Sequence, residues 1–144
     1  MRSMNNQEKI LSYLSTRSRN KIVIFRENIA GIELTNIGLL LSEAIFNLKN
    51  TDRLSIRATN ELEGILQKAT YDHAEYGKIL AITNIGILLE PDLKIDFMRL
   101  LDRYSQNNAL FLHWEGDIDN EHLYFLSKEN GIKIKIKNLS HLAL

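Results

Sequence analysis

Residues 20–33, NKIVIFRENIAGIE, combine an apolar run with a loop, which is the arrangement from which phosphate-binding loops are built. In the spacing G-x-x-x-x-G-K-[ST], the glycines let backbone N–H groups approach phosphate, the lysine neutralises its charge and the hydroxyl binds magnesium. These four positions are occupied here by Arg26, Gly31, Ile32 and Glu33. The cation and the hydroxyl are therefore missing, and Glu33 would place a negative charge against the phosphates. Gly31 alone is retained, and an ordinary turn glycine explains it as well.

A second apolar run, residues 78–83, has the character of a buried strand that leads into a turn. In a nucleotide hydrolase, a strand in this position ends in an aspartate that holds magnesium. Here the matching residue is Thr83, and the next is Asn84, an amide that could orient a ligand or cap the turn. We interpret these six positions as a degenerate nucleotide site, and we expect no ATP hydrolysis, no catalytic residue, no cofactor and no bound metal.

Two other polar clusters could support chemistry. Residues 113–117, HWEGD, bring a histidine and two acids to a strand end, where they could form a metal site or an acid–base pair. There is no second histidine at a ligand spacing, so we favour a structural role for this segment. Asp72, His73 and Glu75 form the other cluster, for which a solvated loop is the simpler explanation.

The lysines near the end of the chain, Lys133, Lys135 and Lys137, alternate with isoleucines. This alternation predicts an edge or amphipathic strand whose charged face resists aggregation. The same lysines could bind nucleic acid together with Arg17 and Arg19, but no aromatic residues are interleaved with them and the net charge is zero. We therefore favour edge protection over nucleic-acid binding.

The composition is that of one ordinary globular domain spanning residues 1–144. Hydrophobic residues make up 44% and charged residues 25% of the chain, and 18 basic residues balance 18 acidic ones, so charge gives no reason to expect nucleic acid or an anionic membrane as a partner. The lack of cysteine excludes disulfides, cysteine zinc sites and thiol catalysis. No apolar run reaches the roughly 20 residues that span a bilayer. We expect a cytoplasmic protein that does not contact the membrane.

The spacing of apolar residues predicts an α/β fold with a mainly parallel sheet flanked by helices and a short N-terminal helix. Polar residues that follow the strands should gather beyond their carboxyl ends, where ligands bind in such folds. These residues are Arg26, Glu27, Asn28, Thr83, Asn84 and Glu115. The expected helices are 7–14, 34–48 (with Thr35 or Asn36 as its cap), 60–69 and 95–104; the expected strands are 21–25, 54–58, 78–83, 109–114, 123–126 and 131–136; and 71–77 is an expected polar connection.

Residues 83–116, TNIGILLEPDLKIDFMRLLDRYSQNNALFLHWEG, resemble the small P-loop protein of BREX phage-defence systems, the BrxF family. Residues 21–33 correspond less closely to the Walker A region of that family. The chain departs from the family pattern at Thr83, which replaces the magnesium-binding aspartate, and at Gly86, which replaces a glutamate. The residues in step with the pattern are Asn84, Ile87, Leu88, Pro91, Leu93, Lys94, Asp96 and Gly116.

The resemblance implies a P-loop-like α/β domain, and the departures imply that catalysis has been lost. We therefore expect a non-catalytic adaptor or structural subunit of a prokaryotic antiviral complex, which contacts larger defence proteins or a second copy of itself. The alternative is a nucleotide- or anion-binding regulator that uses residues 26–31 without hydrolysis, and a nucleic-acid-binding accessory protein is less favoured. Leu39, Leu40 and Phe46 would make the helix 34–48 apolar on a second side, where a partner could bind, although burial within the domain is the simpler explanation.

Overall fold

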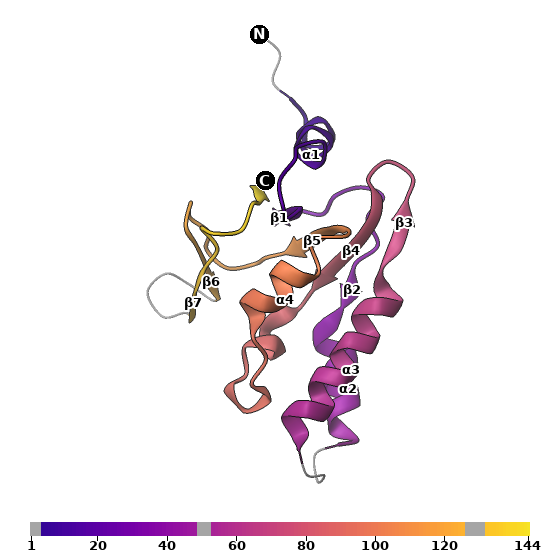
Figure 1. The fold of residues 1–144 in the computed structure, drawn as a ribbon, viewed down its shortest axis with the longest axis vertical. Helices are drawn as coiled ribbons and strands as arrows, with labels where there is room; N and C mark the ends of the chain where they lie inside the picture. Colours follow the sequence, from indigo (N-terminus) through magenta and orange to yellow (C-terminus); the bar gives the residue numbers. More distant parts are fainter. Residues whose placement is uncertain (1–3, 49–52, 126–131) are drawn as a thin grey trace.

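The computed structural model describes residues 4–48, 53–125 and 132–144. Within them, the chain forms one six-stranded sheet, a separate two-stranded sheet and the helices that cover the larger sheet (Figure 1). The helices are α1 (Asn6–Leu14), α2 (Ile37–Phe46), α3 (Leu54–Ala69) and α4 (Phe97–Arg103), with two 3-10 helices, η1 (Ile85–Leu89) and η2 (Pro91–Leu93). The strands are β1 (Ile22–Phe25), β2 (Thr35–Asn36), β3 (Tyr71–His73), β4 (Gly77–Thr83), β5 (Ala109–His113), β6 (His122–Phe125), β7 (Ile132–Lys135) and β8 (Leu142–Ala143).

The main sheet has the strand order β2-β4-β5-β1-β8, and neighbours along this path are parallel. Two short strands share the outer side of β4. β3 pairs antiparallel with the first half of β4, and β2 pairs parallel with the last two residues of β4. All four residues of β1, IVIF, are buried, as are the first four of β5. Such continuous apolar strands require cover on both faces of the sheet. The prediction of an α/β fold with a mainly parallel sheet is therefore confirmed.

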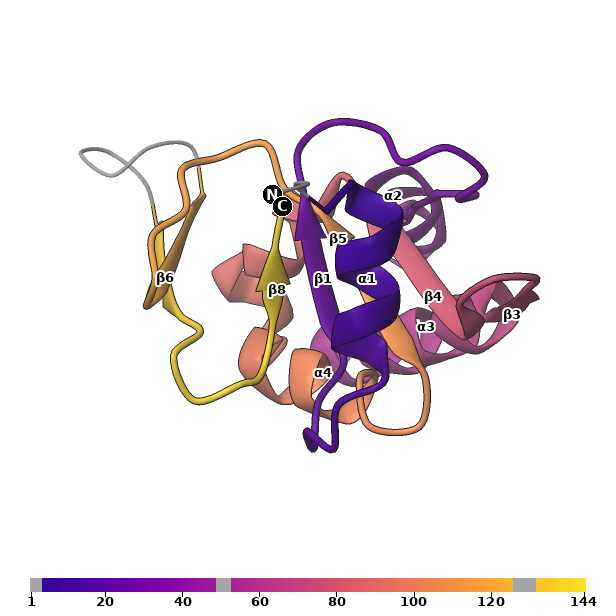
Figure 2. The same cartoon turned by 90° about the horizontal axis from the view of Figure 1, so that it is seen from above.

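Helices cover one face of the sheet, and α1 together with the loop after β1 covers the other (Figures 1 and 2). Ile22 and Ile24 of β1 point into the larger core, which includes buried side chains of α2, α3 and α4. Val23 and Phe25 alternate to the opposite face, where Ile10 of α1 packs against them. The period of two along β1 thus divides the apolar residues between two cores.

A buried amide joins the start of β1 to α4. Asn20 is only 2% exposed, and its Nδ2 donates hydrogen bonds to the Asp102 carbonyl oxygen (3.2 Å), the Asp102 carboxylate (2.9 Å) and the Ser105 hydroxyl (2.9 Å). Arg19 forms an ion pair with the same carboxylate at 3.1 Å. These hydrogen bonds from Arg19 and Asn20 hold the pKa of Asp102 below its ordinary value. The cluster fixes the position of α4 at the amino end of the sheet.

The prediction of a strand over residues 54–58 is wrong, because these residues form the start of α3. Ala58, Leu62 and Leu66 follow one another at steps of four and make a single buried stripe along that helix. The helix expected over 34–48 begins later, at Ile37, because Thr35 and Asn36 pair with the end of β4 as the short strand β2. Asn36 is its cap, and its Oδ1 accepts a hydrogen bond from the Leu39 N–H, so this part of the prediction is confirmed.

The connection expected over 71–77 contains β3, and β8 lies outside every expected strand. The alternation expected over 131–136 is confirmed for its charged face, since Lys133 and Lys135 are exposed and Ile134 is buried. The strand carrying them, β7, pairs with β6 and not with the main sheet. Residues 126 and 131 of the expected strands lie outside the described residues.

Candidate functional site

The carboxyl ends of β4 and β5 border a cleft of about 430 Å³ at one edge of the main sheet. This is the edge at which parallel α/β folds bind their ligands. Its wall also includes the start of η1 and one aromatic side chain from β6. The lining residues are Asn84, Ile85, Gly86, His113, Trp114, Glu115, Gly116 and Phe125.

His113 connects the ends of three strands at this edge. Its Nε2 lies 3.0 Å from the Arg26 carbonyl oxygen, and its Nδ1 lies 2.7 Å from the Thr83 hydroxyl. Because a carbonyl oxygen can only accept, Nε2 carries a proton and donates it to Arg26, while Nδ1 shares the second hydrogen bond with the Thr83 hydroxyl. Both ring nitrogens are thereby occupied, and the ring packs against Phe25 with centroids 5.3 Å apart. His113 holds the strand ends together and has no nitrogen left for a metal or a substrate proton.

Arg26 and Thr83 are therefore brought together as predicted, through His113. The Arg26 guanidinium is turned to the side, where its Nη2 donates to the Gly116 carbonyl oxygen at 2.5 Å. Glu115 lines the same cleft. His113 and Gly116 were not among the residues expected to gather. Their contacts with Arg26 depend on the register of β5 against β1, which places His113 opposite Phe25.

Asn84, the residue directly after β4, adopts the left-handed conformation, with φ of 59°. Its Nδ2 donates to Asn36 Oδ1 at 2.9 Å, and the same oxygen caps α2. Gly38, in the first turn of α2, lies so close that an added Cβ would be 2.3 Å from Asn84 Nδ2. Asn84 thus packs the turn after β4 against the start of α2, which is the structural alternative anticipated for it.

Gly31, Ile32 and Glu33 lie beside β3, away from this cleft. The Gly31 carbonyl oxygen is 3.1 Å from His73 Nε2, and the Glu33 N–H donates to the Tyr71 hydroxyl at 2.9 Å. Ile32 packs into the core formed by Phe25 and its neighbours. Tyr71 and His73 pair with the first half of β4, whereas Thr83 is at its end. The phosphate-loop positions are consequently divided between two regions of the sheet.

This division follows from the path of the loop after β1. Two strands, β5 and β4, separate β1 from β2, so residues 26–34 must cross three strand spacings of about 4.8 Å, roughly 14 Å. The loop is extended over the face of the sheet and ends in β2, so no helix begins directly after it. Gly31 adopts φ of +81°, which accounts for a glycine at this position without a ligand.

The cluster of Asp72, His73 and Glu75 has a structural centre in His73. Its Nδ1 accepts hydrogen bonds from the N–H groups of Glu75 (3.1 Å) and Tyr76 (3.2 Å), so its Nε2 carries the proton that it donates to Gly31. The ring also stacks on Tyr76 at 4.7 Å. Burial, with a smaller contribution from Glu75, raises the pKa of Tyr76. His73 ties the β3–β4 turn to the loop that follows β1.

A turn before β6 is organised by Asp119. Its carboxylate accepts the Tyr124 hydroxyl at 2.6 Å and the N–H groups of Glu121 (2.9 Å) and His122 (2.8 Å). These hydrogen bonds, that of Tyr124 first, hold the pKa of Asp119 well below its usual range. The same contact raises the pKa of Tyr124.

Within the described ranges, no group of three His, Asp or Glu side chains is placed to hold a metal ion. In the same part of the chain, no helix has both the length and the apolar character needed to cross a membrane. Comparisons with protein-family models, curated proteins and solved structures return no match. Function must therefore be argued from the geometry of the chain itself.

Proposed function

We propose that this chain is a non-catalytic adaptor subunit of a prokaryotic phage-defence assembly and acts through protein–protein contacts. The observation that carries the adaptor role is the outer face of α2, defined by Leu39, Leu40 and Phe46. The assignment to phage defence is supported by the resemblance of residues 83–116 to the BREX family.

The outer face of α2 is opposite the side that the fold buries. Ile37, Gly38 and Leu41 of this helix are buried. Leu39 and Phe46 are seven residues apart, so they lie on nearly the same line of the helix, two turns from each other. The two are 54% and 68% exposed, and Leu40, further round the helix, is 40% exposed. Burial within the domain therefore does not account for this face.

Covering this face would provide useful binding energy. Fully burying a leucine or phenylalanine side chain is worth about 1.5–3 kcal/mol, so covering the exposed parts of these three contributes about 2–5 kcal/mol. A few such side chains at the centre of an interface commonly dominate binding. A rigid helix is a suitable platform, because little ordering is needed on association.

The carboxyl-end cleft supports a role without catalysis. His113 is hydrogen bonded to Arg26 and Thr83, and the Arg26 guanidinium is hydrogen bonded to Gly116, so these polar groups already have partners within the chain. The remaining phosphate-loop positions lie beside β3. The strands of the main sheet are mainly parallel, as they are in P-loop folds. A P-loop-like ancestry is therefore part of what we propose. What the fold supplies to a partner, on this view, is a stable support for α2.

The test is an affinity capture from cells of the native host, with the retained proteins identified by mass spectrometry. The wild-type chain should retain large defence proteins, such as a methyltransferase, a nuclease or a large ATPase, and Leu39→Glu with Phe46→Glu should release them. Leu11→Glu is the matched control, because Leu11 is 41% exposed on α1, on the opposite face of the sheet.

Equal retention by the wild type and the double variant would refute the docking face. Recovery of the chain without larger proteins would refute the adaptor role, and sedimentation of the purified protein would then show whether α2 joins two copies of it.

A further inference from the structure

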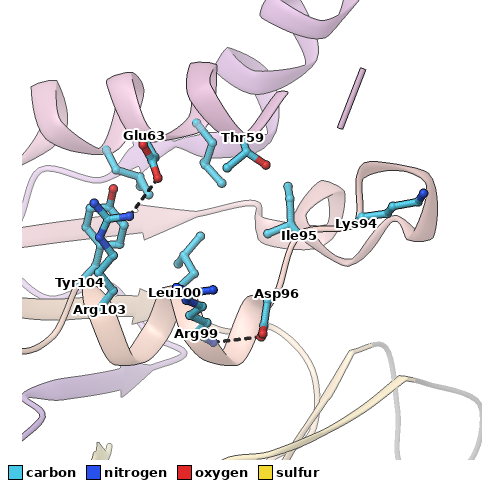
Figure 3. A pocket seen from close by; sticks show the side chains of 11 residues that line it. Thr59, Glu63, Lys94, Ile95, Asp96, Arg99, Leu100, Arg103 and Tyr104 are labelled. Atoms are coloured by element: carbon cyan, nitrogen blue, oxygen red, sulfur yellow. Dashed lines mark hydrogen bonds and ion pairs between the residues drawn. The ribbon is translucent and has the colours of Figure 1, made fainter. Parts of the chain in front are cut away.

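A second cleft, of about 450 Å³, lies on the helical side of the sheet between α3 and α4 (Figure 3). Its walls come from the middle of α3, the connection between η2 and α4, and α4 itself with the residue that follows. The volume falls in the range of small-molecule sites, roughly 300–1,000 Å³. None of its residues belongs to the carboxyl-end cleft or to the outer face of α2.

The polar side of this cleft includes two arginines of α4, Arg99 and Arg103. Arg103 Nη1 pairs with Glu63 Oε1 of α3 at 2.9 Å, and this contact neutralises the acid. The Asp96 carboxylate accepts the backbone N–H of Arg99 and caps α4. No side chain in the described part of the chain pairs with the Arg99 guanidinium, whose donors remain available. Lys94, at the rim, points away from the other labelled side chains (Figure 3).

Tyr104 supplies the second observation that points to a ligand. Its hydroxyl is buried, yet no described residue forms a hydrogen bond with it. Figure 3 shows the ring beside Arg103, with the hydroxyl directed toward α3. A buried hydroxyl without a partner is uncommon, because the hydrogen bonds that it made to water in the unfolded chain are then not replaced. Tyr104 lines the cleft, so a small shift of the neighbouring side chains on binding would let a ligand oxygen accept from this hydroxyl.

The floor between these polar groups is apolar. Its apolar lining consists of Leu62 and Leu66 from α3, Leu100 from α4, and Ile95. A free guanidinium, an unpaired hydroxyl and an aliphatic floor together suit a molecule with an acidic head and an apolar body.

We propose that the cleft between α3 and α4 binds a small amphipathic anion, a carboxylate or phosphate monoester with an apolar body, whose acidic group pairs with Arg99 and whose oxygen accepts from the Tyr104 hydroxyl. The apolar body lies on Leu62, Leu66 and Leu100. Glu63 keeps Arg103 engaged, so a ligand with one acidic group is preferred over a polyanion. This binding does not depend on α2 or on a defence partner.

The experiment titrates the full chain with 8-anilinonaphthalene-1-sulfonate, an amphipathic anion that fluoresces in apolar sites, and in parallel with neutral N-phenyl-1-naphthylamine. The sulfonate should bind one site, and Arg99→Met should weaken it about tenfold, the loss expected for one charge-assisted contact. Tyr104→Phe should weaken it by a smaller factor, about fivefold. Arg57→Met is the matched control, since Arg57 is exposed on the same helix as the cleft wall but does not line the cleft.

Thr59→Trp, which fills the cleft and leaves Arg99 intact, should abolish binding, and far-UV circular dichroism checks that each variant is folded. Displacement by octanoate and by octyl phosphate distinguishes the two acidic groups. The proposal is overturned if Arg99→Met and Arg57→Met bind the sulfonate equally, or if the neutral probe binds as tightly. Stronger displacement by polyglutamate than by octanoate would assign the cleft to an acidic protein segment and would also overturn it.

Discussion

Replacing Gly38 with alanine should force α2 away from the turn that follows β4. A Cβ at this position would lie 2.3 Å from Asn84 Nδ2 and 2.5 Å from the Asn84 carbonyl oxygen. The side chain of Asn84 can rotate, but its carbonyl oxygen belongs to the backbone. Either the helix or the turn must therefore move to accept one methyl group.

The magnitude follows from three contributions. Overpacking of this kind costs about 1–3 kcal/mol. The movement also breaks the 2.9 Å hydrogen bond between Asn84 and Asn36, a loss of about 1 kcal/mol. The better helix propensity of alanine returns at most about 1 kcal/mol. The variant should therefore be less stable by about 1–3 kcal/mol.

Urea unfolding followed by far-UV circular dichroism measures this difference as a shift of the midpoint. Gly64→Ala is the matched control, because Gly64 lies inside α3 and an added Cβ meets nothing within 4 Å. That variant should be more stable by about 0.5–1 kcal/mol. The two substitutions are chemically identical and should move the midpoint in opposite directions. An unchanged or raised midpoint for Gly38→Ala would refute the reasoning.

Asn20→Ala should lower the free energy of unfolding by about 2–4 kcal/mol, because the buried amide holds Asp102 and Ser105; a urea midpoint like that of the exposed control Asn60→Ala would contradict this. The hydrogen bonds that lower the pKa of Asp119 stabilise the folded protein at every pH above 3.8, the ordinary pKa of this carboxyl group. This stabilisation is lost as the pH falls below 3.8 and through the folded-state pKa. The difference in melting temperature between the wild type and Asp119→Asn should accordingly narrow below about pH 4, and a constant difference would count against it. Titration with MgATP should give no binding heat and no released phosphate; phosphate release that depends on the protein would show that the degenerate loop still functions.

The strands at the centre of the sheet are predictable from sequence because their apolar runs are continuous. β1 and β5 fall within the expected ranges for this reason, and β4 begins one residue before its expected range, at Gly77. The start of α3 is not predictable from its own residues, because residues 54–58 also alternate in polarity, and only the longer stripe through Leu66 indicates the helix. β8 has two residues, and its pairing with β1 depends on a contact across most of the chain.

The candidate site was predictable only in part. Arg26 and Thr83 both contact His113 because parallel strands share their carboxyl edge. The position of Gly31 beside β3 depends on the strand order, since the loop must cross the sheet before it reaches β2. The cleft at Arg99 and Tyr104 joins two helices that are distant in sequence, so no local spacing could indicate it.

The place of β1 inside the sheet has a consequence for folding during synthesis. Ile22 pairs with Leu110, 88 residues later, and Val23 pairs with Leu142, near the end of the chain. At the usual rate of about 5–20 residues per second, the ribosome needs several seconds to produce the first of these partners. During that time the apolar segment IVIF has no strand to join. Contacts between residues this far apart in sequence also slow the folding of the released chain. The nascent protein is therefore most exposed to aggregation and to chaperone capture through its first strand.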